Sequence, residues 1–534
     1  MMCVRDNRPT GAKRIPGATG GPHRGMVLIF VLVVVALLTL AGLTFSELML
    51  VERQAAELSG RRAQSRALAD SGLEMARLFL AWEEEAQIEA GGWYDNPDRF
   101  GGVLILDDED ARRRGRFTMV APRIEAGRIE AGRFDRIRFG LEDESTRLNL
   151  NCLSLADQAA DSGGRQILMG LPGMTEDVAD AILDWIDTDD EPREYGAEID
   201  YYSSLDPPYA TKNGPLETIE ELLLVRGVTP WLLFGADANR NGYRDRSEPD
   251  PETVAEVDNS DGSMDRGWAA YLTLYSMESN LLQPDGQPRV DLGLEDMEQL
   301  HRELEQALGN PQWATFIVAY RQNGPYKGSG EGEEAPSGKI DLSKPGKFPV
   351  KTVLDLIGPR VRVTFEGDRT PTILETPFPN EPEEMSAYLP VLMDHVTATS
   401  STTIPGRINI NQASATVLAG IPGMTDQIVD EILTRRQPDP ADADPQRRHE
   451  TWIRSEEICT LEEMKALMPF VCAGGSVYRT QAIGYFDQGG PASRVEAVLD
   501  ATIRPARVIF WRDMSHLGRG YPLETLLGTE ALER

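Results

Sequence analysis

The feature that most constrains this chain is an uncharged apolar stretch near its N-terminus, Met26–Phe45 (MVLIFVLVVVALLTLAGLTF). As a helix it is long enough to cross the hydrocarbon core of a bilayer, which is about 30 Å thick. Basic residues precede the stretch, and the first acidic residues after it are Glu47 and Glu52. The positive-inside rule therefore places the N-terminus in the cytoplasm and most of the chain across the membrane.

Gly25 stands directly before this stretch, whereas an ordinary signal peptide has a shorter apolar region followed by small residues at its cleavage site. The order of basic leader, glycine and apolar helix resembles the class III leader of type IV pilins and type II secretion pseudopilins. The resemblance implies that a prepilin peptidase cuts between Gly25 and Met26 on the cytoplasmic side. Met26 would then be the methylated N-terminus. A plain signal anchor with a coincidental glycine is the alternative.

Most members of these families carry Glu at the fifth position after the cut, which is Phe30 in this chain. In the family, that Glu pairs with the N-terminal amine of the preceding subunit and helps a new subunit add beneath it. A subunit without it need not dock beneath another one. Phe30 is therefore expected to be a determinant of a tip position.

The rest of the chain predicts an α+β fold. Apolar residues recur at near-helical spacing as far as Leu80 without a proline, which predicts an amphipathic stem after the membrane segment. Short β-type runs lie at 102–140 and again near the C-terminus (VYRTQAIGYFDQ, SRVEAVLDATIRP, ARVIFWRDM), which predicts one sheet domain interrupted by a large, mostly helical insertion. The N-terminal parts are expected to be a basic leader (1–25), a transmembrane helix (26–48) and a stem helix (49–91). The first part of the sheet domain (92–150) follows, and then an inserted helical domain (151–400) that contains flexible loops at 323–348. A second helical hairpin and the last strands of the sheet domain form the end of the chain (401–534).

An internal repeat lies in the insertion. Asn149-Leu-Asn leads to LPGMTEDVADAIL at 171–183, and Asn409-Ile-Asn leads to IPGMTDQIVDEIL at 421–433. Each copy indicates a helix, a tight Pro-Gly turn and a second helix capped by Thr175 or Thr425. A looser third unit is TIEELLLVRGVTPWLL at 218–233.

These helix-hairpin-helix-like units suggest a rival function, because such hairpins can direct backbone N–H groups at DNA phosphates. The DNA-binding versions usually carry a second glycine two residues after the first, where this chain has Thr175 and Thr425. The chain has 54 basic and 86 acidic residues, and its net charge of −32 repels phosphate backbones. No nucleic acid partner is therefore expected, although an envelope-anchored DNA-uptake protein or a type IV pilus tip protein stays the alternative.

The first repeat runs into Asp184-Trp-Ile-Asp187-Thr-Asp189-Asp190-Glu191-Pro, then Gly196-Ala-Glu198 and Tyr201-Tyr. Together with the second repeat and the β-rich tail ending in Trp511, this order of motifs resembles the minor pseudopilin family known as general secretion pathway protein K (GspK). The resemblance implies a ferredoxin-like pilin domain with a helical insertion that contains calcium. It also implies a single-pass protein of the inner membrane, with its bulk in the periplasm, that joins other minor pseudopilins at the tip of the pseudopilus.

One segment, from Asp237 to Glu248, fits the spacing of an EF-hand calcium loop. Side-chain oxygens would come from Asp237, Asn239, Asn241 and Glu248, the backbone carbonyl from Tyr243, and a water-mediated contact from Asp245. Arg244 and Pro249 depart from the pattern of paired sensor loops, so a solitary structural loop is expected. An acidic turn without an ion is the alternative.

A second candidate calcium site is an acidic cluster near the first repeat. Its carboxylates repel one another unless they are solvated or bridged by a cation. The cluster consists of Asp187, Asp189, Asp190, Glu191, Glu198 and Asp200.

Catalysis finds no support in the sequence. The five histidines are scattered without a metal-binding spacing, and no G-x-S-x-G motif occurs. The chain is therefore expected to work by assembly and not as an enzyme. Cys459 and Cys472 can form a disulfide only if the fold brings them together, which the sequence leaves open.

Overall fold

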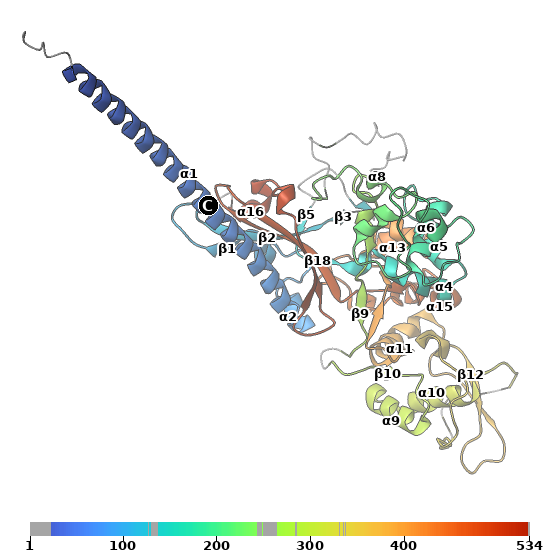
Figure 1. The fold of residues 1–534 in the computed structure, drawn as a ribbon. Coiled ribbons are helices and arrows are strands. Elements are labelled where there is room, and N and C mark those ends of the chain that lie inside the picture. The colour runs from blue at the N-terminus through green and yellow to red at the C-terminus, as the bar shows by residue number, and fades with distance from the viewer. Residues whose placement is uncertain are drawn as a thin grey trace, which may run out of the picture. The chain divides into compact units, whose positions relative to one another are not determined.

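The computed structural model describes residues 23–125, 128–129, 137–242, 248, 264–282, 286–330, 332–334, 336 and 338–531. The chain divides into two units, Met1–Ala63 and Gln64–Arg534, which are described separately. The architecture mixes helices and sheets and begins with a long apolar helix (Figure 1).

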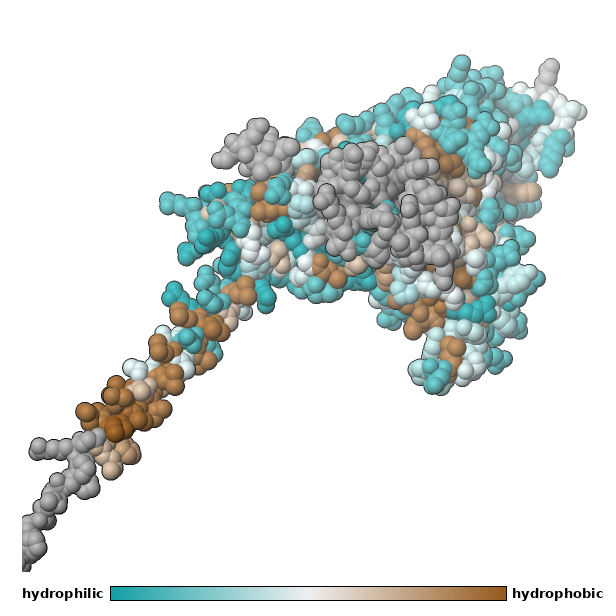
Figure 2. All heavy atoms as spheres, turned by 90° about the horizontal axis from the view of Figure 1, so that it is seen from above, coloured by the Kyte–Doolittle hydropathy of each residue, from teal (hydrophilic) through white to brown (hydrophobic). Residues whose placement is uncertain are grey.

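Helix α1 (His23–Phe79) contains the apolar stretch that the sequence analysis singled out. Its apolar side chains from Met26 to Phe45 are exposed, and Figure 2 shows them as a continuous hydrophobic surface along the helix. Among the described residues, α1 is the one helix whose length and hydropathy suffice to span a membrane. The prediction of an apolar N-terminal helix is confirmed.

The stem helix ends earlier than the predicted residue 91. Leu80 still bonds the carbonyl of Ala76, but the next two amides reach back only three residues, from Ala81 to Leu78 (3.2 Å) and from Trp82 to Phe79 (3.1 Å). Phe79 and Leu80 are buried, so the helix stops where these side chains enter the core. Two short helices follow, α2 (Glu84–Glu89) and α3 (Pro97–Phe100).

The second unit is built on a seven-stranded sheet. Its main order is β1 (Val103–Leu106), β2 (Gly115–Pro122), β18 (Val477–Phe486), β19 (Ser493–Asp500) and β20 (Arg507–Asp513). Strand β5 (Ile137–Phe139) pairs with β2, and β6 (Glu142–Asp143) pairs with β18. All of these pairs are antiparallel. Strands from the two ends of the chain therefore form one sheet, as the sequence pattern predicts; the ferredoxin-like topology stays a prediction.

Each face of the sheet has its own covering element (Figure 1). On one face, the last turns of α1 pack through Ala69, Leu73, Ala76 and Phe79 against side chains of β2, β18 and β19. On the other face, Leu526 of α16 (Leu523–Ala531) lies in a second core cluster. The backbone carbonyl of Leu526 accepts hydrogen bonds from the hydroxyls of Thr118 and Tyr485, at 2.8 Å each.

Helix α1 lies directly on the backbone of β18. A Cβ atom added at Gly484 would lie 2.0 Å from the carbonyl oxygen of Ser65 and 2.6 Å from the amide nitrogen of Ala69. On the helix side, a Cβ atom at Gly72 would lie 2.8 Å from the ring of Phe117 in β2. The sheet and the helix can approach this closely only because both positions lack a side chain.

We expect Gly484→Ala to lower the free energy of unfolding by about 1–3 kcal/mol, the usual cost of overpacking a core. The added methyl group meets backbone atoms, which cannot move aside as a side chain can. Gly474→Ala is the matched control, because no atom lies within 4 Å of its Cβ position. Denaturant unfolding of the two variants measures the difference, and equal midpoints would contradict the close approach.

The insertion occupies the chain between β6 and β18. Its part before the distal lobe contains η2 (Glu144–Thr146), β7 (Leu148–Asn149), η3 (Leu150–Cys152), α4 (Leu153–Ala159), α5 (Gly163–Met169), α6 (Glu176–Ile186), α7 (Ile199–Tyr202), η4 (Ile219–Leu224), α8 (Pro230–Phe234), η6 (Trp268–Ala270) and β8 (Leu272–Thr273). Its part after that lobe contains β16 (Ile408–Asn409), α12 (Ala415–Ala419), α13 (Asp426–Arg435), η8 (Pro445–Arg447), α14 (Trp452–Ser455), α15 (Leu461–Leu467) and β17 (Val471–Cys472).

The two sequence repeats occupy matching places in the insertion. One Pro-Gly-Met-Thr turn joins α5 to α6, and the other joins α12 to α13. The glycines that precede the turns touch each other, because a Cβ atom at Gly170 would lie 2.6 Å from the Cα of Gly420. Each repeat is also closed by a short parallel pair, β7 with β8 and β16 with β17. The repeat is therefore visible in the packing as well as in the sequence.

A distal lobe, residues 290–397, lies between these two parts. Its elements are β10 (Val290–Asp291), α9 (Met297–Leu308), α10 (Pro311–Asn323), β11 (Pro325–Tyr326), η7 (Val353–Leu356), β12 (Arg360–Val363), β13 (Thr372–Leu374), α11 (Pro382–His395) and β14 (Val396–Thr397). The chain enters and leaves this lobe through the antiparallel pair β9 (Met277–Ser279) and β15 (Thr403–Pro405). The predicted loop at 323–348 contributes β11 to a three-stranded sheet with β12 and β13.

The described cysteines are all free. Cys459 and Cys472 are both buried, and neither is in a disulfide. The pairing that the sequence left open is therefore absent from this fold.

Candidate functional site

The processing residues lie at the start of α1. The helix begins at His23, so it runs without interruption through Gly25 and Met26. Phe30 is 70% exposed and belongs to the apolar surface of the helix. Cleavage between Gly25 and Met26 stays a prediction.

The acidic segment after α6 is organised around an arginine. The guanidinium of Arg193 donates to Asp184 at 2.8 Å and also to Asp187. Asp184 is completely buried, and burial raises the pKa of both carboxyl groups despite this positive partner. Arg193 and Asp184 were not among the predicted site residues, although Asp184 lies on α6 only three residues before Asp187, which directly follows the helix.

Glu198 carries the unbalanced charge of this segment. It is 3% exposed, and both of its oxygens are buried without a hydrogen-bond partner. The nearby hydroxyl of Thr211 acts to lower its pKa. Burial, followed by the negative charges of Asp184 and Asp187, raises the pKa of Glu198 to about 7. One oxygen of Asp187 is also buried without a partner.

The other predicted members of the cluster face solvent. Asp189, Asp190, Glu191 and Asp200 are exposed. Asp189 accepts the amide of Glu191 at 3.0 Å, and Asp190 accepts from Asn213 at 2.7 Å. The structure therefore brings together Asp187 and Glu198, with Asp184 as the added neighbour, and leaves the remaining four at the surface.

The donor chemistry of this segment fits calcium only in part. Within the described ranges, no group of three or more histidine, cysteine, aspartate or glutamate side chains is arranged to hold a metal ion. Arg193 already neutralises Asp184 and one side of Asp187. The unpartnered oxygens of Asp187 and Glu198 are nevertheless hard acceptors of the kind that Ca²⁺ prefers.

Glu198→Gln tests whether this carboxylate is a cation ligand. In chelator, Glu198 has a higher pKa in the folded state (about 7) than the ordinary value of 4.5, so wild-type stability falls as the pH rises from about 4.5 to 7. The amide removes that buried charge, so the variant should melt higher than wild type at pH 7.5 and lose this pH dependence. In Ca²⁺ the order should reverse, because only the wild type gains a ligand.

Glu191→Gln is the matched control, because its exposed carboxylate should matter little in either condition. Thermal melts in chelator and in millimolar Ca²⁺ measure both effects. A Ca²⁺ shift that is equal in the two variants would exclude Glu198 as a ligand.

The EF-hand-like segment is partly described. Asp237 is 7% exposed and accepts the backbone amides of Asn241 at 3.0 Å and Gly242 at 2.8 Å. Asn239 accepts the same amide of Asn241, and its own amide donates to Glu248 at 3.3 Å. These bonds close the loop and bring Asp237, Asn239 and Glu248 together; Tyr243 and Asp245 lie outside the described residues.

Two features of this loop suit a tight cation-binding turn. Gly242 has a φ of +82°, which favours glycine at the sharp bend. Burial raises the pKa of Asp237 to about 6, against the opposing charge of Arg266. The loop is therefore shaped around a buried carboxylate whose charge is poorly compensated.

The sheet and the C-terminal segment hold this loop from outside. Gln481 of β18 donates to the carbonyl of Arg240 at 2.9 Å, and the hydroxyl of Tyr521 donates to the carbonyl of Asn241 at 2.9 Å. The side-chain amide of Asn241 donates to the carbonyl of Gly520 at 2.7 Å. The candidate loop therefore lies at the junction between the insertion and the sheet.

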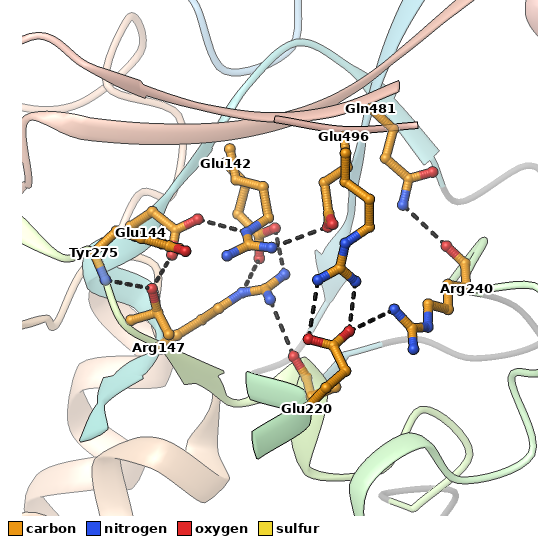
Figure 3. Close-up of polar contacts among 12 residues, drawn as sticks. Glu142, Glu144, Arg147, Glu220, Arg240, Tyr275, Gln481 and Glu496 are labelled. Atoms are coloured by element: carbon orange, nitrogen blue, oxygen red, sulfur yellow. Dashed lines mark hydrogen bonds and ion pairs between the residues drawn. The ribbon is translucent and has the colours of Figure 1, made fainter. Parts of the chain in front are cut away.

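A network of buried and half-buried ion pairs fills the rest of this junction (Figure 3). Glu220 of η4 accepts both Arg512 of β20, at 2.6 and 3.0 Å, and Arg240, at 2.8 Å. Arg479 of β18 contacts Glu144 and lies 2.9 Å from Glu496. The network thus links the sheet to segments of the insertion that are far away in the sequence.

The pKa values of the network follow from these pairs. Burial disfavours the charged form of Glu220 and of Glu496, but Arg512 and Arg479 outweigh it and hold both pKa values below the ordinary range. In the same way Arg147, 2.6 Å from Glu142, holds the pKa of Glu142 low despite its burial. Each of these carboxylates is therefore held in its charged form by an arginine.

The hairpin turns offer no cradle for phosphate. The first turn of α6 carries Glu176 and Asp177, and that of α13 carries Asp426. Acidic side chains at a helix N-terminus compete with an incoming anion for the same positive end of the dipole. This arrangement argues against the DNA-binding alternative.

Comparison with known families and proteins gives a consistent result. Residues 146–233 match the family model for type II secretion system (T2SS), protein K. A "Type II secretion system protein K" of Pectobacterium carotovorum subsp. carotovorum is 43% identical over 169 residues, which cover 28% of this chain and 50% of that protein. A "Putative type II secretion system protein K" of Escherichia coli K12 is 32% identical over 103 residues, covering 17% of this chain and 32% of that protein. The chain thus spans a third to a half of the curated relatives it matches.

Among solved structures, the chain is similar to one in the crystal structure of the GspK-GspI-GspJ complex from the type 2 secretion system of enterotoxigenic Escherichia coli. The sequence identity is 10% and the TM-score is 0.36, over 87% of this chain and 98% of that chain.

Over the matched segments, the chain is similar to protein K of type II secretion systems.

Proposed function

We propose that this protein is a minor pseudopilin that forms or caps the tip of the periplasmic pseudopilus. The observation that carries the proposal is the match of residues 146–233 to the protein K family, whose region includes the helical hairpin and acidic segment of the insertion. The protein would work by assembly with other minor pseudopilins and not by catalysis. In the solved complex from enterotoxigenic Escherichia coli, GspK is bound to GspI and GspJ, and we propose partners of this kind for this chain.

The N-terminal helix would anchor the protein in the inner membrane before assembly. The first half of α1 exposes an uncharged apolar surface, which is stable only in lipid or against other apolar helices. The cytoplasmic side would carry the basic leader, and the sheet and insertion would lie in the periplasm.

Calcium would be a structural cofactor of the insertion. The loop with Asp237, Asn239, Asn241 and Glu248, completed by Tyr243 and Asp245, and the pair Asp187 and Glu198 are the proposed binding positions. The cation would neutralise carboxylates whose pKa values burial raises. Two oxygens of Glu198 and one of Asp187 without partners support this assignment.

We expect the mature protein to begin at Met26. Replacing Gly25 with a bulky residue, as in Gly25→Leu, should leave the uncut precursor in the membrane fraction, because the peptidase needs a small residue before the cut. Gly42→Leu, a matched change inside the apolar stretch with no atom within 4 Å of its Cβ position, should still be processed. N-terminal sequencing of the wild type and of both variants shows which of them are cut. A mature wild-type protein that starts at Met1 would contradict the proposal.

The proposed position at the tip of the pseudopilus leads to a second prediction. Protein labelled in the distal lobe should appear at filament ends and in small amounts, because a bulky insertion can occupy the end of a heterologous assembly but not its repeat. Labelled major subunit, which should decorate the whole length, is the control. Immunogold electron microscopy measures both, and labelling along the filament at equal stoichiometry would exclude a capping role.

A further inference from the structure

Exposed apolar side chains gather at one place on the first part of the insertion. Single exposed apolar residues are normal on a protein surface, whereas a contiguous group of them marks an interaction site. Five large apolar side chains between residues 195 and 224 are 36–47% exposed, and we call this set the tyrosine patch. It consists of Tyr195, Ile199, Tyr201, Leu223 and Leu224.

One arginine and one buried ring hold the tyrosine patch together. The guanidinium of Arg226 lies 5.4 Å from the centre of the Tyr201 ring and donates a hydrogen bond to the carbonyl of Tyr195. The ring of Tyr201 packs edge-on against that of Tyr202, which is completely buried, with 5.1 Å between the ring centres. The hydroxyl of Tyr202 accepts the amide of Arg226 at 3.2 Å. These two segments of the chain therefore form one surface.

The backbone at Leu224 is held from the same side. Its carbonyl accepts the hydroxyl of Tyr209 at 2.8 Å, and the Tyr209 ring lies 5.3 Å from that of Tyr202. Groups that are already ordered lose little conformational entropy when a partner binds. Tyrosine and arginine are also enriched among the residues that carry the binding energy of protein interfaces. The tyrosine patch is therefore pre-organised for contact with another protein.

The charge around the tyrosine patch is mostly negative. Four exposed carboxylates adjoin it, and none of them forms an ion pair with a residue that the structure describes: Glu176, Glu194, Asp200 and Asp206. The neighbouring cations are paired with other carboxylates, Arg165 with Asp180, Arg193 with Asp184, and Lys212 with Glu221. Of the cations near the patch, only Arg226 has no carboxylate partner within the described ranges. A surface that covers the patch must therefore supply positive charge together with apolar groups.

We propose that the tyrosine patch is the docking surface for a segment of a partner protein that presents lysine or arginine beside apolar side chains. The apolar groups bury against Tyr201 and Leu224, and the cations meet the carboxylates around the patch. An anionic membrane surface or a nucleic acid is repelled by the same carboxylates. This inference rests on the proposed function, because it gives the chemistry of one partner of the insertion. The patch adjoins the proposed calcium position at Glu198, so Ca²⁺ is present in every test.

Photo-crosslinking of the full chain, in cells that assemble the secretion system, tests the docking surface. The substitution Tyr201→p-benzoylphenylalanine is expected to capture one protein, and mass spectrometry of the linked peptide is expected to identify a segment that is both basic and apolar. The same substitution at Phe348, an exposed aromatic residue of the distal lobe, is the control. No product beyond that of the control, or a linked segment without lysine and arginine, would overturn the proposal.

A synthetic peptide with the sequence of the linked segment then measures affinity for the full chain in detergent and millimolar Ca²⁺. Tyr201→Ala should weaken binding roughly tenfold or more, as truncation of a central tyrosine does at an interface. Ile503→Ser removes a similarly exposed apolar side chain from the sheet domain and should bind as wild type does. Equal affinity of the Tyr201 variant and wild type would place the segment elsewhere. Leu224→Ser, at a more exposed position, decides the question if Tyr201→Ala does not fold.

Immunogold labelling of filament ends reports on the pseudopilin role separately. A chain that reaches the filament ends but gives no specific product from position 201 would contradict this inference alone. A chain that gives the product but is absent from the filament ends would contradict the proposed function and leave the docking surface in place.

Discussion

The contact of α1 with β18 at Gly484 is the constraint on which the sheet domain depends. The carbonyl of Ser65 and the amide of Ala69 occupy the space where any side chain on Gly484 would lie. The buried face of this part of the helix consists of small residues and a few leucines, which lets the helix lie against both central strands. The last turns of α1 are therefore a layer of the sheet domain and not a separable stem. The first half of the same helix exposes its apolar residues.

The ion pairs at the junction have a different role from the apolar core. Replacing buried pairs with apolar residues is often neutral or stabilising, whereas removing one partner leaves an uncompensated charge. Arg479 and Arg512 each meet a carboxylate from a distant segment, Glu144 and Glu220. A shifted insertion would separate these charges, of which the Arg479–Glu144 pair is buried and the Arg512–Glu220 pair half-buried. We interpret the network as a determinant of how the insertion docks on the sheet, more than as a source of stability.

Much of the local structure could be predicted from the sequence. The apolar stretch, the strands at both ends and the two Pro-Gly-Met-Thr turns follow from composition and periodicity over fewer than about 20 residues. The end of the stem could not be predicted, because Phe79 and Leu80 continue the helical pattern and only the core that buries them ends it.

The residues of the candidate sites could also be predicted only in part. In the segment from Asp237 to Glu248, hydrogen bonds connect Asp237, Asn239 and Glu248 through the loop backbone, and their role as calcium ligands stays a prediction. For the acidic cluster, the sequence predicts more calcium ligands than the structure brings together. Spacing alone does not show that Asp189 and Asp200 are exposed to solvent. Arg193 and the charged junction were missed, because pairs such as Arg512 with Glu220 join residues 292 positions apart. No local pattern records such a partner.

The pairing of β2 with β18 has a consequence for the order in which the chain takes shape. Thr118 and Ile483, which are register partners on these two strands, are 365 positions apart. At about 5–20 residues per second, a ribosome needs roughly 20–70 s to make the intervening chain. During that time β2 has no central partner, and the apolar face of α1 that will rest on the sheet has nothing to cover it. The insertion is already complete at Cys472, before the first residue of β18 is made. The large insertion is therefore synthesised as a finished unit before the domain that carries it can close.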